Sequence, residues 1–211
     1  MLYETFNSIR ESLIIIKEII FMSVAIATVV IAYFGLRTWN AQLKGTTKYK
    51  IAKDVLTKTF KLRDEFSVTR NPLITAAEMS HVNNNESELE SRNILSSIDK
   101  LSFKAHLKRL QNLNDVKQEL EITKLEADAV FGKKETEEIK KLIEKVYQMN
   151  KEFNFMYEMK HTEDWGKEEK ELLNTARRIL YSFAAAGEDN FGKKIMDLVN
   201  GIEEKFRKYL K

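Results

Sequence analysis

The sequence contains no cysteine, and only one of its 211 residues is proline and seven are glycine. The absence of cysteine excludes disulfide bonds, thiolate zinc sites and cysteine nucleophiles. A β-rich fold needs turn residues roughly every 8–12 positions, so the scarcity of proline and glycine favours an all-α protein. The formal net charge is only +3, so we expect no nucleic-acid partner drawn by an overall field.

Charged residues are also missing from positions 19–36, an apolar run of 18 residues. This length is enough for a helix to cross a bilayer, and we predict a single transmembrane helix here. The segment Ala25-Ile26-Ala27 is similar to the cleavage site of a signal peptide. Because the apolar run continues for nine residues beyond Ala27, we favour a retained membrane helix over a cleaved leader.

Residues 1–18 have an amphipathic pattern that leads into the apolar run. Apolar residues recur at spacings of four and three, namely Leu2, Phe6, Ile9, Leu13, Ile16 and Ile20. This period predicts a helix with one apolar face. We interpret it as a lead that lies at the membrane interface, with the alternative that it extends an oligomerisation stripe along the span.

Basic residues near the two ends of the run predict its orientation. Arg10 and Lys17 precede the run, whereas five basic residues follow it closely: Arg37, Lys44, Lys48, Lys50 and Lys53. Since cytoplasmic flanks carry the excess of Lys and Arg, we expect the N-terminus outside and the C-terminal part in the cytoplasm, at the inner membrane of a cell. Tyr33 and Trp39 are predicted to be anchors at the membrane interface, and membrane lipid is an expected partner.

Small residues line one side of the predicted span. They are Ala25, Thr28, Ala32 and Gly35, at spacings of three, four and three. Close packing over small residues drives helices together in lipid, so we predict a homo-oligomer that packs through this face. The alternative is that alanine and glycine are simply common in membrane helices.

The rest of the chain is patterned as helices of a cytoplasmic bundle. We predict a juxtamembrane helix over 37–69, a loop over 70–86 and a bundle over 87–211 that packs with 46–69. The dipeptide Asn71-Pro72 ends the first helix, and Thr75 with Glu78 is a possible capping box for a short helical turn inside the loop. Short connections favour an antiparallel bundle of about five helices.

Within the bundle, the most regular apolar row is predicted over 135–160. It consists of Ile139, Leu142, Val146, Met149, Phe153 and Met156. We predict further helices over 87–131, with a possible break near Asn112–Asp115 and an end at Gly132, and over 168–186, with Leu172 on its apolar face and an end at Gly187. A last helix follows Asp189, a candidate N-cap.

Motifs that carry chemistry are sparse, and we predict no catalytic, cofactor or metal residues. Two Glu-x-x-His pairs, Glu78/His81 and Glu158/His161, have the i, i+3 spacing found in di-iron bundles, but one lies in the predicted loop and the other at a helix end. His106 is expected to be a neutral surface side chain. The pair Arg63-Asp64 is expected to hold the juxtamembrane helix to the bundle, with a ligand-binding role as the alternative.

The chain resembles a group of uncharacterised bacterial membrane proteins that have one N-terminal span and a helical cytoplasmic part. The residues that carry the resemblance are Trp39-Asn40-Ala41-Gln42-Leu43-Lys44-Gly45, Tyr49, Ala52, Arg63-Asp64, Arg70-Asn71-Pro72, Ile179-Leu180-Tyr181, Phe191 and Ile202-Glu203. The resemblance implies the same topology and adds no site.

These observations favour a non-enzymatic, membrane-anchored scaffold or signalling protein that binds itself or an unknown cytoplasmic protein. A first alternative is a membrane effector, of a toxin or phage-defence type, that oligomerises and permeabilises the bilayer. A second alternative is a metal-binding helical bundle that uses the Glu-x-x-His pairs.

Overall fold

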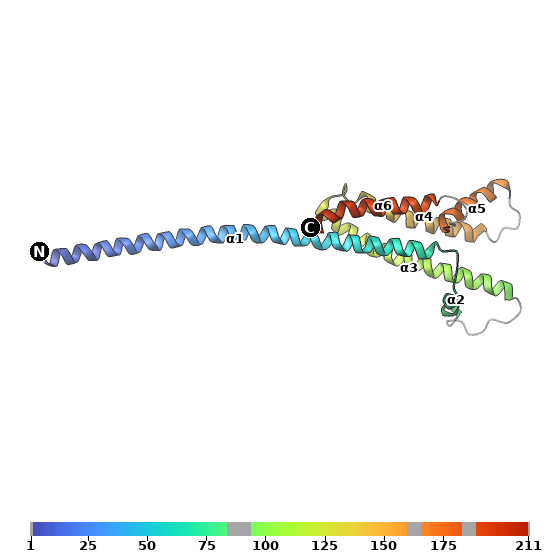
Figure 1. The fold of residues 1–211 in the computed structure, drawn as a ribbon, viewed down its shortest axis with the longest axis horizontal. Helices are drawn as coiled ribbons and strands as arrows, with labels where there is room; N and C mark the ends of the chain where they lie inside the picture. The colour runs from blue at the N-terminus through green and yellow to red at the C-terminus, as the bar shows by residue number, and fades with distance from the viewer. Residues whose placement is uncertain (1, 84–93, 160–165, 183–188, 211) are drawn as a thin grey trace. The chain divides into compact units, whose positions relative to one another are not determined.

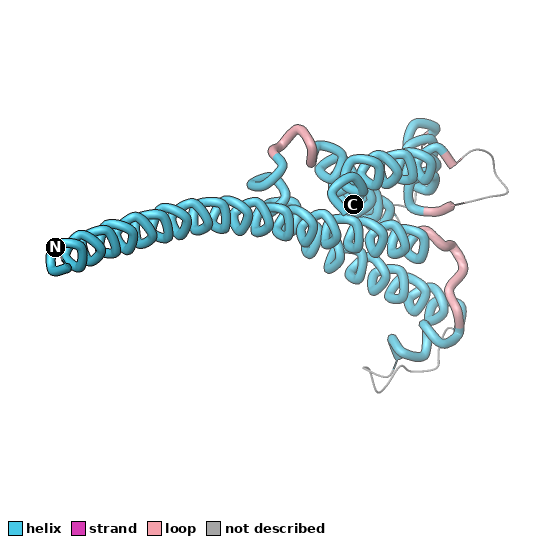
Figure 2. Tube along the Cα trace, turned by 60° about the vertical axis from the view of Figure 1, so that its left-hand side comes forward, coloured by secondary structure: helices cyan, strands magenta, loops and turns pink. Residues whose placement is uncertain are grey.

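The structure is a computed structural model that describes residues 2–83, 94–159, 166–182 and 189–210. Within these ranges the chain is all-helical and has no strand, as predicted (Figures 1 and 2). The helices are α1 (Leu2–Thr69), α2 (Ala76–Asn83), α3 (Ile94–Phe131), α4 (Glu137–Met159), α5 (Lys167–Leu180) and α6 (Asn190–Arg207), followed by the short 3₁₀ helix η1 (Lys208–Leu210).

Helix α1 joins the predicted lead, span and juxtamembrane helix into one element of 68 residues. It continues without interruption through Gly45. It ends at Thr69, two residues before Asn71, as the proline at position 72 predicts. The last turn is closed by the amide of Arg70, which donates to the carbonyl of Phe66 at 3.0 Å.

The chain divides into two units, residues 1–48 and residues 49–211. The first unit is formed by the first part of α1. The second unit contains the remainder of α1 and the helices α2 to α6, and it holds the hydrophobic core.

The core of the second unit is built by the apolar faces of α1, α3, α4 and α6, to which α5 adds Leu180. Helix α1 contributes a row that includes Ile51, Val55, Leu62 and Phe66. Helix α3 contributes Leu113, Val116 and Leu120; α4 contributes Ile139, Leu142, Ile143, Val146, Met149 and Phe153; α6 contributes Phe191, Ile195, Val199, Ile202 and Phe206. Helix α4 is packed against α3, α5 and α6, so the apolar row predicted over 135–160 lies at the centre of the unit.

The region predicted as a loop contains α2, a helix of eight residues that begins where the sequence predicted a short helical turn. The capping box proposed there is confirmed: the Glu78 amide donates to the Thr75 hydroxyl at 3.3 Å, and the Thr75 amide donates to the Glu78 carboxylate at 2.9 Å. This reciprocal pair satisfies amides at the start of α2 and favours the helix. Residues 84–86 of the predicted loop lie outside the described residues.

Helix α3 has no break near Asn112–Asp115, contrary to the prediction. Asn114 remains helical because its side-chain amide donates to the carbonyl of Leu110, at 2.9 Å, and also forms a reciprocal pair with Asn150 of α4. The asparagine therefore satisfies its polar groups within the helix and across the contact with α4, where the sequence rule assumed competition with the backbone.

The helix ends of the second unit follow the predicted residues in two of three cases. Gly132 ends α3 with a φ of 86°, a left-handed conformation that favours glycine. Asp189 caps α6 by accepting from the Gly192 amide at 2.9 Å. Helix α5, by contrast, ends at Leu180 because Tyr181 is extended, and Leu172 on its predicted apolar face is exposed. Gly187, the predicted end of this helix, lies outside the described residues.

Candidate functional site

The apolar run of α1 is exposed along its whole length. Every residue from 19 to 36 is exposed, and Phe21 and Ile31 expose 71% and 72% of their surfaces. By length and composition, this part of α1 is suited to cross a membrane. Such a long apolar surface is costly in water, so it needs either lipid or a partner around it.

The predicted packing face lies on this exposed helix. Ala25, Thr28, Ala32 and Gly35 are all exposed, and a Cβ atom added at Gly35 would meet no other atom within 4 Å. The Thr28 hydroxyl donates to the carbonyl of Val24 at 2.8 Å, so its polar group is satisfied within the helix. The face is therefore apolar and accessible, as close approach of a second helix requires.

The side chains of the amphipathic lead are described only in part. Leu13 and Ile16 are exposed on α1. The side chains of Leu2, Phe6 and Ile9 lie outside the described residues.

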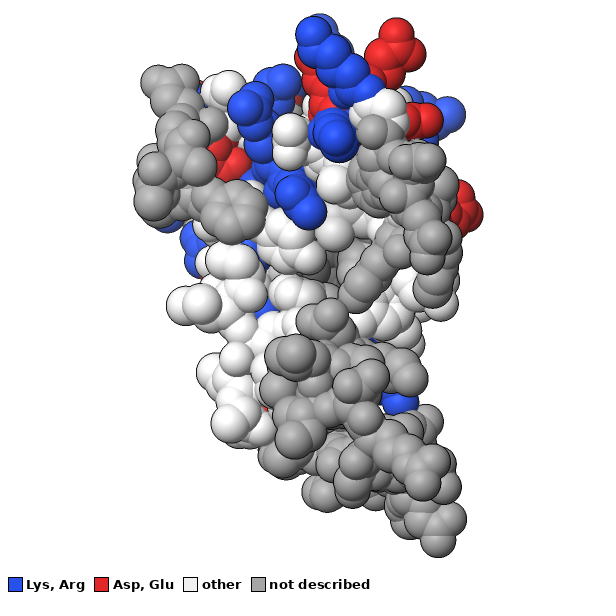
Figure 3. Space-filling view, turned by 90° about the vertical axis from the view of Figure 1, so that its right-hand side faces the viewer, with Lys and Arg blue, Asp and Glu red and all other residues white. Residues whose placement is uncertain are grey.

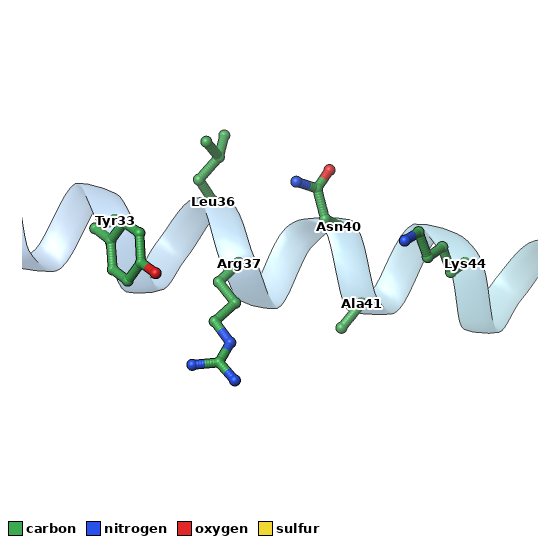
Figure 4. Close-up of a pocket in the computed structure, with 6 residues that line it drawn as sticks. All are labelled: Tyr33, Leu36, Arg37, Asn40, Ala41 and Lys44. Carbon is green, nitrogen blue, oxygen red and sulfur yellow. The ribbon is translucent and has the colours of Figure 1, made fainter.

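A shallow groove follows the apolar run on α1. Its volume is about 420 Å³, and it is lined by Tyr33, Leu36, Arg37, Asn40, Ala41 and Lys44. Figure 4 shows Leu36 and Asn40 on one side of the helix and Arg37 and Ala41 on the other. Trp39, the second predicted anchor, is also exposed in this stretch. The groove thus combines apolar side chains with two cations and an amide.

A buried arginine joins three segments of the second unit. The Arg70 guanidinium forms two hydrogen bonds with the Asp189 carboxylate, at 2.7 and 2.8 Å. Its Nε donates to the carbonyl of Ile179 at 2.9 Å, and its Nη2 donates to the carbonyls of Arg178 and Tyr181. We call Arg70 and Asp189 the Arg70 clasp, because together they connect the end of α1, the end of α5 and the start of α6.

A second buried arginine holds the connection between α1 and α2. Arg109 of α3 donates to both carboxylate oxygens of Glu78, at 2.7 and 2.8 Å. It also donates to the carbonyls of Asn71 and Leu73, at 2.7 and 2.8 Å. We call Arg109 and Glu78 the Arg109 clasp. Through it, one side chain satisfies the carbonyls around Pro72 and fixes α2 on α3.

Both clasps stabilise the ionised carboxylates. The hydrogen bonds from Arg109 lower the pKa of Glu78 from 4.5 to about 2, with further help from the Thr75 amide. The hydrogen bonds from Arg70 likewise lower the pKa of Asp189, and the Gly192 amide adds to this effect. Hydrogen bonds between charged groups are in general stronger than those between neutral groups.

His106 lies in a small aromatic cleft. The cleft measures about 160 Å³ and is lined by Ser102, Phe103, His106, Phe153, Met156, Tyr157 and Tyr181. Burial lowers the pKa of His106, and the positive charge of Arg109 lowers it further. A lowered pKa favours the neutral form of the ring. The ring is not the predicted surface side chain, because it is half-buried against Tyr181, with ring centroids 5.4 Å apart. The cleft is smaller than typical ligand pockets and has no carboxylate among its lining residues.

The structure separates the other predicted site residues. Glu78 is occupied by Arg109 and Thr75, Glu158 is exposed, and the side chains of His81 and His161 lie outside the described residues. No group of three metal-ligating side chains occurs among the residues that the structure describes. Arg63 and Asp64 form an ion pair at 2.8 Å, but both belong to α1, so this pair does not connect α1 to another helix.

Arg63 and Asp64 instead line an open groove beside the Arg70 clasp. Its volume is about 440 Å³, and its walls are Arg63, Asp64, Phe66, Ser67, Arg70, Ser182, Asp189, Gly192, Ile195 and Met196. The Arg70 guanidinium and the Asp189 carboxylate bind each other here. Their charges therefore neutralise each other and connect the walls of the groove, so they are not available to a ligand.

Sequence reasoning missed the role of both clasps. In the sequence analysis Arg70 was named only within the resemblance, Asp189 only as an N-cap, and Arg109 had no predicted role. The sequence offered one signal: each arginine stands where the helical pattern favours an apolar residue. These positions are Arg70, directly after the last residue of α1, and Arg109, beside Leu110. Their partners are 119 and 31 residues away along the chain, a distance that periodicity does not predict.

Charges of both signs are mixed on the described surface. On the face that Figure 3 presents, Lys and Arg side chains lie beside Asp and Glu, and many of the other described residues are uncharged. Such a mixture forms no continuous basic stripe on this face.

Comparison of this chain with known protein families, with curated proteins and with solved structures gives no match.

Proposed function

We propose that this protein is a membrane-anchored helical interaction protein of the bacterial inner membrane. In this proposal α1 crosses the bilayer once, with its N-terminus outside, and the second unit lies in the cytoplasm as a non-catalytic scaffold or signalling module. The observation that carries the proposal is the exposed, uncharged run 19–36 of α1. It is long enough to span the hydrocarbon core, and lipid is the surrounding that makes this surface favourable.

The orientation rests on the five basic residues that follow the run. A C-terminal fusion to green fluorescent protein should fluoresce, and the same position fused to alkaline phosphatase should be inactive. The reason is that the basic flank stays on the cytoplasmic side. Phosphatase activity in the second fusion would show that the orientation is the opposite of the one proposed. Recovery of the full chain in the soluble fraction would refute the membrane anchor itself.

We propose self-association through the small-residue face of α1. Replacement of Ala25 and Ala32 by leucine should weaken association in the membrane, because the larger side chains keep two helices apart. Replacement of Ser23 and Ala27 by leucine is the matched control, since these small residues lie on the opposite side of the helix. Energy transfer between labelled chains in vesicles measures the association. If the energy transfer is equal in both double variants, the small-residue face does not mediate the association.

The second unit is proposed to be an antiparallel bundle. Side-chain contacts between α3 and α4 support this: Glu121 pairs with Tyr147 and Asn114 pairs with Asn150, so the residue number falls along one helix as it rises along the other. The connection from Phe131 to Glu137 is also short. Since the chain has no cysteine, single cysteines introduced at Gln118 and Gln148 provide clean sites for a distance measurement by spin labels. A separation typical of opposite helix ends would contradict the arrangement.

A cytoplasmic protein partner is proposed to bind the second unit at α3. Ile122 and Leu125 are exposed by 60% and 67%, and their spacing of three places them on one side of the helix. Serine at both positions should abolish binding of a purified partner, whereas serine at exposed Leu172 of α5 should not.

Dye release from vesicles that contain the intact protein would instead favour the oligomerising effector.

A further inference from the structure

The groove on α1 has a chemistry that an apolar anchor does not need. Arg37, Asn40 and Lys44 bring two cations and an amide to one stretch of helix, and Lys48 follows one turn later. Arg37, Lys44 and Lys48 are seven and four residues apart, which places them within about 40° of one another around the helix. A guanidinium and ammonium groups on one side of a helix match the oxygen atoms of a phosphate group.

The positive charge here is not neutralised by the described part of the chain. No acidic residue occurs between Ile19 and Lys53 in the sequence. Arg37, Lys44 and Lys48 form no ion pair among the residues that the structure describes. Further along α1 the situation changes, because Lys61 pairs with Glu119 of α3 at 2.9 Å. The cations nearest to the apolar run are therefore uncompensated among the described residues.

The neighbours of the cations indicate which anion fits. Tyr33 and Leu36 line the same groove and belong to the apolar run, and all the groove residues come from one helix. A ligand in this groove meets apolar side chains at one end and cations at the other. A phospholipid has this distribution of polarity, whereas a nucleic acid or a free phosphate has no apolar part. Trp39, exposed in the same stretch, suits the interface between headgroups and acyl chains.

We propose that this groove binds the headgroup of an anionic phospholipid, with its phosphate held by Arg37 and Lys44. Lys48 supports the site from the next turn, and Leu36 contacts the start of an acyl chain. This inference rests on the proposed membrane anchor. It adds that the anchor selects its lipid by charge.

Trp39 provides the measurement. The chain has two tryptophans, so the substitution Trp165→Phe leaves Trp39 as the single reporter. The full chain is reconstituted in two kinds of phosphatidylcholine vesicle. One contains brominated phosphatidylglycerol, and the other contains the same fraction of brominated phosphatidylcholine. Bromine quenches tryptophan at contact. We expect the brominated anionic lipid to associate with Trp39 about fivefold more strongly, the effect of one basic residue at an anionic surface.

Two double variants separate a site from a diffuse surface charge. Arg37→Gln with Lys44→Gln should remove the preference, whereas Lys50→Gln with Lys53→Gln removes the same charge outside the groove and should retain it. Arg37→Lys should retain most of the preference for the anionic lipid. Equal loss in both double variants, or equal quenching by the two lipids in the unmodified groove, would overturn the lipid site and leave the anchor in place. The absence of quenching by either lipid would overturn both the anchor and the site.

Discussion

The Arg70 clasp makes a quantitative prediction about the second unit. Arg70 exposes only 5% of its side chain and Asp189 exposes 31%. Removal of one partner of a buried ion pair costs about 3–5 kcal/mol, because the other charge stays without its partner. Since Asp189 is partly accessible to water, we expect the low end of this range, so Arg70→Ala should destabilise the unit by about 3 kcal/mol.

Two further variants divide this effect into its parts. Arg70→Lys keeps the charge but loses the planar fork that meets Asp189 and the three carbonyls, so it should cost about 2 kcal/mol. Asp189→Asn keeps a good N-cap for α6 and removes the negative charge alone. It should therefore also destabilise the unit by about 2 kcal/mol, because Arg70 is left buried without a counter-ion.

The matched control lies seven residues earlier on α1. Arg63 and Asp64 form a pair of similar length, 2.8 Å, but their side chains are 37% and 67% exposed. Because exposed pairs contribute little, Arg63→Ala should change the stability by less than about 0.5 kcal/mol. Both pairs join an arginine to an aspartate, so the comparison measures the effect of burial together with the three carbonyl bonds that Arg70 makes.

Pulse proteolysis in urea, with the full chain in a mild detergent, measures these differences in the free energy of unfolding. In a thermal experiment, 3 kcal/mol corresponds to a fall in Tm of about 6–12 °C for a protein of this size. A double-mutant cycle with Arg70→Ala and Asp189→Ala should give a coupling of about 2 kcal/mol. If Arg70→Ala and Arg63→Ala have equal small effects, the clasp does not hold the three segments together.

Substitutions at Glu78, Gly132 and Leu142 each test a single feature of the fold by the same measurement. Glu78 has a lowered pKa of about 2 in the folded state, so the stability that its charge contributes is complete above pH 4.5 and is lost as the pH falls towards 2. Glu78→Gln should therefore flatten the dependence of stability on pH in this window. An unchanged dependence would contradict the Arg109 clasp. Gly132→Ala should cost about 1–2 kcal/mol because of the φ of 86°, and Gly132→Asn should cost less. Leu142→Ala should cost about 2–5 kcal/mol at its fully buried position, whereas Leu172→Ala at an exposed position should be near neutral.

The helices were predictable because their signals are local. The apolar row of α4 and the cap at Asp189 depend on residues within about four positions of each other, and each was read from the sequence. The capping box at Thr75 and Glu78 was also visible, yet the polar stretch around it favoured a loop. The structure places α2 there because Arg109 binds Glu78 and gives this short helix a tertiary support.

The errors in the prediction share a physical cause. Asn114 was expected to interrupt α3, but Asn150 on α4 accepts its amide. Arg63-Asp64 was expected to hold α1 to the bundle, but Arg70 has the buried position and the distant carboxylate. In each case, the decisive partner lies on another helix, so a rule about neighbours in the chain has no information about it.

For this protein, the sequence by itself determined the helical class and the uncharged run 19–36 with its basic flank. These properties follow from composition and from the period of the α-helix. The tertiary structure alone decided which polar residues are buried and what they bind. The reason is that burial of an arginine is favourable only where a carboxylate and free carbonyls converge on it, and packing brings those groups together from positions 70, 179 and 189.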